Sequence, residues 1–60
     1  MKDRIEEIFA KMEEFRKEST DHATQGNKLA GRRARVASLE LTKMLKEYRW
    51  VSVEWDKGNN

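Results

Sequence analysis

The chain has 60 residues, of which 40% are charged, a formal net charge of +2, and neither cysteine nor proline. This length allows one domain at most, and a chain so short buries only about 60% of its unfolded surface, so a core of its own is marginal. The missing cysteine excludes disulfides and thiolate metal sites, and a single histidine makes no metal site unless several carboxylates converge on it. Self-association is the remaining source of stability, and we expect a homo-oligomer.

The composition also limits the location and the fold class. No apolar run approaches the ~20 residues of a membrane span, and the N-terminus alternates charge from Lys2 onward without the apolar stretch of a signal peptide. We therefore expect a cytoplasmic protein with no membrane contact. The many Glu, Lys, Arg, Ala and Leu residues favour helix throughout, so the expected class is all-α.

Residues 3–23 have the pattern of an amphipathic helix. Asp3 is the expected N-cap, and Glu6 follows three residues later as in a capping box. Lys11 is expected to pair with Glu7 one turn before it. Ser, Thr, Asp and His weaken the pattern after residue 18. The apolar stripe, at steps of three and four and widened by Phe9, consists of Ile5, Ile8, Met12 and Phe15.

A turn and a longer second helix follow. Gly26 suits a left-handed C-terminal cap, and Asn27 suits the N-cap of a helix over residues 28–55. The apolar residues of this second helix recur at steps of four and three, in the order Ala30, Ala34, Ala37, Leu41, Met44, Tyr48, Val51 and Trp55.

Folding the chain at Gly26 predicts an antiparallel hairpin, because large residues then oppose small ones, as Phe15 opposes Ala37. A continuous helical rod is the alternative, although it has to absorb a one-residue phase slip near Gly26. Residues 1–60 form one helical domain in either case, and residues 56–60 are expected to be a frayed polar tail.

A second apolar set lies on the far side of the second helix. A lone hairpin exposes it to water, and exposed apolar patches usually mark a contact surface. We interpret the set as an oligomer interface that joins hairpins into a four-helix assembly. Its members are Val36, Leu39, Trp50 and Val53.

The sequence offers no catalytic or cofactor site. It has no phosphate-binding Gly-rich loop and no HExxH-type motif, and adjacent carboxylates such as Glu13 and Glu14 point to different sides of a helix. His22 lies at an apolar-stripe position near the turn, where a packed structural histidine is the simpler interpretation than a ligand or a switch. We expect no enzyme, no cofactor, no metal and no small-molecule substrate.

The distribution of charge is the main functional signal. Residues 1–25 carry five basic and seven acidic residues, whereas residues 26–50 carry seven basic and two acidic ones. Arginine and lysine in a row along a helix can contact successive phosphates of a duplex. Nothing in the row has the placement of a base-reading helix, so binding is expected to be independent of sequence. The basic row consists of Lys28, Arg32, Arg33, Arg35, Lys43, Lys46 and Arg49.

The second half also resembles a known family. The elements are Gly26-Asn27-Lys28, the Arg33-Ala34-Arg35 step, Leu39–Lys46, Tyr48-Arg49 and Val51-Ser52, in that order and after an acidic amphipathic helix. Together they resemble the histone-like Hc family of bacterial nucleoid proteins, known from chlamydiae and, in short forms, from Bacteroidota.

The resemblance implies non-sequence-specific DNA binding and nucleoid compaction, with Lys28, Arg33, Arg35 and Arg49 as the matching basic positions. Longer relatives carry a Lys/Ala-rich C-terminal tail. This chain, which ends at Asn60, resembles a short form without it, and Trp50 stands where a lysine is expected.

The resulting hypothesis is a histone-like, nucleoid-associated protein that contacts the phosphates of double-stranded DNA. The alternative is a small coiled-coil module that binds a protein partner through its second apolar face and has no nucleic-acid role. The preference for DNA over RNA, the oligomer size, and whether DNA is bent, bridged or compacted stay open.

Overall fold

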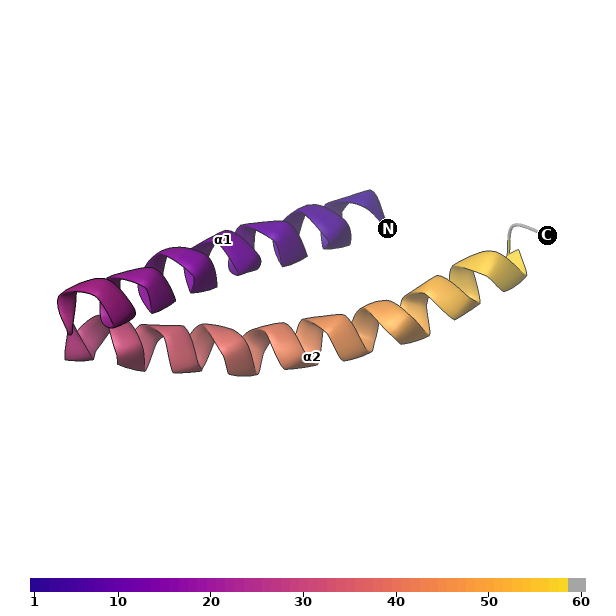
Figure 1. The fold of residues 1–60 in the computed structure, drawn as a ribbon. Coiled ribbons are helices and arrows are strands. Elements are labelled where there is room, and N and C mark those ends of the chain that lie inside the picture. Colours follow the sequence, from indigo (N-terminus) through magenta and orange to yellow (C-terminus); the bar gives the residue numbers. More distant parts are fainter. Residues whose placement is uncertain (59–60) are drawn as a thin grey trace.

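The computed structural model describes residues 1–58, which form two α-helices, α1 (Lys2–Gln25) and α2 (Lys28–Gly58). The helices lie antiparallel along each other as a hairpin (Figure 1). The predicted all-α hairpin is therefore confirmed, and the continuous rod is wrong. Asn59 and Asn60, the end of the tail predicted to fray, lie outside the described residues.

Both helices are longer than predicted. The hydroxyls of Ser19 and Thr24 donate to carbonyls of their own helix, at Arg16 and Thr20, so the polar segment continues α1 to Gln25 instead of breaking it. At the start of α1 the predicted cap is wrong. Met1 is the N-cap, without a side-chain hydrogen bond, and Asp3 lies inside the first turn, where its carboxylate meets the positive end of the helix dipole.

The predicted turn is confirmed at both of its residues. Gly26 has φ 65° and ψ 23°, a left-handed conformation that favours glycine, and its N–H donates to the His22 carbonyl over 3.0 Å. Asn27 then caps α2, because its Oδ1 accepts the Ala30 N–H at 3.1 Å. Two residues thus reverse the chain and satisfy groups at both helix ends.

The core between the helices is small and built from small residues. Ile8 is the buried apolar residue of α1, and the N-terminal half of α2 contributes Ala30, Ala34 and Ala37, the last only 1% exposed. Along the C-terminal half of α2 the predicted core positions from Leu41 to Val51 are half-buried. So little buried apolar surface makes the isolated hairpin marginal, as its length predicts.

The helices approach most closely near the turn. A Cβ built on Gly31 would lie 2.7 Å from the Cδ2 of His22, so glycine is the residue that fits beneath the imidazole. One turn earlier in α1, Glu18 is buried, with the residue only 8% exposed, and its Oε1 lies 3.8 Å from the Nζ of Lys17. Sequence reasoning did not single out Gly31 or Glu18.

Two ion pairs, one heptad apart, tie the helices along one edge. Arg4 meets Glu47 at 3.1 Å, and Lys11 meets Glu40 at 2.6 Å. Lys11 also binds Glu14 at 2.7 Å, so the predicted pair with Glu7 is not the one that forms. Hydrogen bonds from the Lys11 ammonium to Glu14 and Glu40 raise the pKa of Lys11 above its ordinary 10.5.

α2 has 31 residues and α1 has 24, and the C-terminal turns of α2 project past the start of α1 (Figure 1). Trp55, predicted to end the apolar row, is half exposed in this projecting part. The hairpin is thus tightly packed at the turn and open at the other end.

Candidate nucleic-acid interface

The side of α2 that faces away from α1 is the candidate interface. At about 100° per residue, Lys28, Arg32, Lys43 and Lys46 lie within about 35° of the direction opposite the buried alanines, and Arg35 lies within about 50° of it. Arg49 lies nearly 90° to one side of this direction. We call this surface the outward face of α2.

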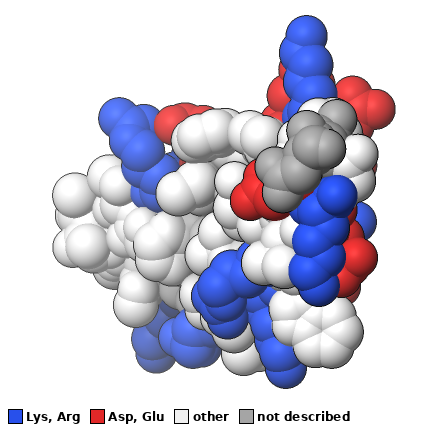
Figure 2. Space-filling view, turned by 90° about the vertical axis from the view of Figure 1, so that its right-hand side faces the viewer, with Lys and Arg blue, Asp and Glu red and all other residues white. Residues whose placement is uncertain are grey.

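All seven residues of the predicted basic row are exposed. Within residues 1–58, none of the seven forms an ion pair with an aspartate or glutamate. Their cations are therefore uncompensated and open to an external anion. The end-on view of Figure 2 shows several Lys and Arg side chains along its lower side, where α2 lies, and others at its top and upper left, whereas the Asp and Glu side chains lie in its upper half and at its right.

Several acidic residues of the hairpin are already engaged in ion pairs. In α1, Glu13 pairs with Arg16, and Asp21 pairs with Lys17. In α2, Glu40 and Glu47 turn toward α1 and pair with its cations. The ion pairs of these acids thus all go to cations of α1, and none goes to a cation of the outward face.

Arg33 stands apart from the other members of the basic row. It lies about 140° around α2 from Lys28, toward the ion-paired edge of the hairpin, where it lines a hollow with Lys11, Glu40 and its neighbour Arg32. The structure therefore gathers six of the seven predicted cations on or beside one face and leaves the seventh at the edge.

The second apolar set lies on the same outward face, between the cations. Leu39 is 67% exposed, Trp50 is 73% exposed, and Val36 and Val53 are about half exposed. Sequence reasoning assigned the basic row to DNA and this apolar set to an oligomer interface. The fold puts both on one surface, where the two uses compete.

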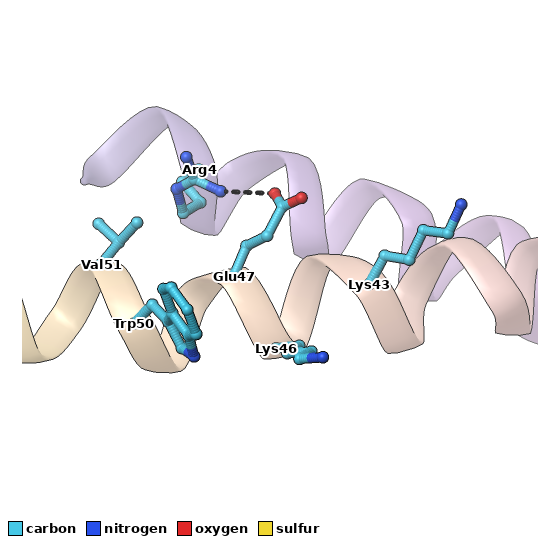
Figure 3. A pocket seen from close by; sticks show the side chains of 6 residues that line it. All are labelled: Arg4, Lys43, Lys46, Glu47, Trp50 and Val51. Atoms are coloured by element: carbon cyan, nitrogen blue, oxygen red, sulfur yellow. Dashed lines mark hydrogen bonds and ion pairs between the residues drawn. The ribbon is translucent and has the colours of Figure 1, made fainter.

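Trp50 borders a surface hollow of about 450 Å³ near the open end of the hairpin. Its lining includes Lys43, Lys46 and the Arg4–Glu47 pair (Figure 3). The indole and Lys46 project from the side of α2 away from α1, whereas the ion pair bridges the two helices. An aromatic ring and two unpaired lysines thus meet at one place on the surface.

A model of the histone H1-like protein Hc1 family matches residues 2–58. The chain belongs to the histone H1-like Hc1 family. The sequence resemblance is thereby confirmed, and membership makes the chain a histone-like, DNA-binding protein associated with the nucleoid. No curated protein and no solved structure matches it.

No helix within residues 1–58 has the length and apolar character needed to cross a bilayer. In the same part of the chain, no three His, Asp or Glu side chains come together as a metal site.

Proposed function

We propose that this Hc1-family chain binds double-stranded DNA without sequence preference, through phosphate contacts from the outward face of α2. The observation that carries the proposal is the set of exposed cations without an acidic partner in the described part of the chain. The nearest acids of α2, Glu40 and Glu47, pair with Lys11 and Arg4 of α1 instead. Phosphates that meet such cations release condensed counterions, which drives association.

The geometry of the outward face supports backbone contact over base reading. Lys28, Arg32 and Arg35 follow one another at one-turn intervals along an exposed helix, so their charged ends reach a series of anions. The Ser38 and Thr42 hydroxyls donate to carbonyls of α2 itself. No Asn or Gln stands among these cations to pair with a base edge, so affinity should vary little between duplex sequences.

We also propose that the hairpin self-associates, because its core is small and apolar side chains remain exposed on both helices. The predicted interface on the outward face is exposed, as that interpretation requires. A two-fold interface there, however, brings the patch against itself and sets unpaired cations of one copy against those of the other.

A lateral edge of the hairpin is the better candidate for self-association. At 100° per residue, Phe9 and Met12 of α1 and Leu45 of α2 lie on the edge opposite the Lys11–Glu40 pair, and all three are 40% exposed or more. An interface there buries apolar surface and leaves the outward face free for DNA.

The rival function is a protein-interaction module that uses the exposed apolar set around Leu39 and Trp50. A protein partner on that face has to desolvate several unpaired cations or supply acids for them. A nucleic acid supplies the anions itself, which is why we favour it.

The deciding experiment is a gel-shift titration of the full chain against random-sequence duplex DNA over a series of salt concentrations. If each chain contacts about four phosphates, the slope of log affinity against log salt is near −3.6 per chain. Equal affinities for AT-rich and GC-rich duplexes are expected. No binding at low salt would overturn the proposal in favour of the protein-interaction module.

A further inference from the structure

The exposure of Trp50 is the feature that phosphate binding leaves unexplained. Tryptophan is the largest apolar side chain, and on average it is highly buried in folded proteins. Here it is 73% exposed, more than any other exposed large apolar residue in residues 1–58. Its indole stands away from α1 (Figure 3), so it contributes little to the core of the hairpin.

The surroundings of Trp50 have the chemistry of a nucleotide site. Lys43 and Lys46 line the same hollow of about 450 Å³, and neither has an acidic partner among residues 1–58. A flat aromatic face beside unpaired cations matches a nucleotide, which presents a base and a phosphate. Proteins that bind single-stranded nucleic acid combine these two elements, aromatic rings for the bases and a positive groove for the backbone.

We propose that Trp50 stacks on an unpaired base of single-stranded DNA while Lys43 and Lys46 hold the adjacent phosphates. This inference rests on the proposed phosphate binding and adds a ligand class to it. In an intact duplex the base faces are covered by their neighbours, so the indole reaches one only if a base step opens. Single-stranded or locally melted DNA offers the base faces freely.

Charge distinguishes this occupant from a second copy of the chain. A copy that docks symmetrically on Trp50 brings its own Lys43, Lys46 and Arg49 to the same place, where the nearby carboxylates of Glu47 and Glu54 are already paired with Arg4 and Lys57. Single-stranded DNA brings one phosphate with each base. The nucleic acid therefore satisfies both the ring and the cations.

The test uses fluorescence and two matched variants of the full chain. In Trp55→Leu, all indole emission comes from Trp50, and this chain is titrated with an oligothymidine of about 16 nucleotides and with duplex of the same length. We expect strong quenching by the single strand and weak quenching by the duplex. No quenching by the single strand would overturn the stacking proposal, and equal quenching by both would overturn the preference for unpaired bases.

Trp50→Leu keeps an apolar side chain and a similar helix propensity while it removes the aromatic face. Loss of one base–ring stack should weaken single-strand affinity by about 5- to 150-fold. Trp55→Leu should leave single-strand affinity unchanged, and the duplex salt slope of both variants should match that of the natural chain. If Trp50→Leu lowers the oligomer mass and not the single-strand affinity, the ring belongs to a protein interface. Failure of duplex binding in the natural chain would instead count against the proposed function.

Discussion

The imidazole of His22 lies directly over Gly31, so that a Cβ at residue 31 would sit 2.7 Å from Cδ2 and 2.9 Å from Cγ of the ring. We predict that Gly31→Ala destabilises the hairpin even though alanine is the better helix former by about 1 kcal/mol. The added methyl has to displace the His22 ring, whose Cγ as well as Cδ2 lies within 3 Å of it, and overpacking of this kind costs about 1–3 kcal/mol. Urea denaturation followed by circular dichroism measures the change.

The chain supplies a matched control for this prediction. A Cβ at Gly58, also helical, meets nothing within 4 Å, so Gly58→Ala should be neutral or slightly stabilising. Adding His22→Ala to Gly31→Ala should restore much of the lost stability, because the two changes act on one contact. A Gly31→Ala chain as stable as Gly58→Ala would mean that the helices separate easily at the turn.

Ala37 tests the packing farther from the turn. It is 1% exposed, and Ala37→Phe should lower the free energy of unfolding by about 1–3 kcal/mol through overpacking. Ala10→Phe makes the same change at an exposed position of α1 and should cost only a few tenths of a kcal/mol in helix propensity. Equal melting temperatures for the two variants would contradict the burial of Ala37 between the two helices.

Lys11 gives the hairpin a predictable response to alkaline pH. Its pKa is raised above 10.5 by hydrogen bonds to Glu14 and Glu40, so the stabilisation is fully present below pH 10.5 and is lost as the pH rises through the higher folded-state value. The melting-temperature difference between the natural chain and Lys11→Met should stay constant up to about pH 10 and shrink above it. A difference that already shrinks at neutral pH would show that another group is responsible.

The charge of the outward face is tested by the salt slope of duplex binding. Replacing Arg32, Arg33 and Arg35 by Gln keeps helix propensity nearly constant, and losing two or three phosphate contacts should flatten the slope by about 2–3 units. Arg33 lies at the edge, so we expect most of the effect from the other two.

A second triple variant controls for net charge. Lys2, Arg16 and Lys17 are exposed cations of α1, and their replacement by Gln removes the same charge from the other helix. This variant should leave the slope much closer to that of the natural chain. An equal effect of the two triple variants would point to overall charge instead of a defined face.

Self-association is expected at micromolar concentration. Sedimentation equilibrium should give a mass above the 7.1 kDa of one chain. Phe9→Gln with Met12→Gln should lower that mass, whereas Val36→Gln with Leu39→Gln, the same number of apolar side chains replaced on the outward face, should not. The reverse result would support the interface on the outward face that the sequence predicts. If the mass is that of one chain at all concentrations and helicity is complete, both interfaces are excluded.

Local interactions were readable from the sequence because they depend on residues close together in the chain. Gly26 and Asn27 determine the turn through one left-handed conformation and one side-chain cap, and both were predicted correctly. The alanine spacing of the second helix identified its buried side. The family resemblance likewise needed only the order of short motifs, and it identified a DNA-binding protein.

The tertiary structure decided which partner each charged side chain has. Lys11 had acids within reach on its own helix, and its choice of Glu40 depends on how the two helices are rotated against each other, a property that no single helix encodes. The same rotation buries Glu18, leaves Phe9 and Met12 at an edge, and brings Gly31 beneath His22. It also puts the unpaired cations and the exposed Trp50 on one face. The packing of α1 against α2 decides which side of α2 is buried and which side is exposed.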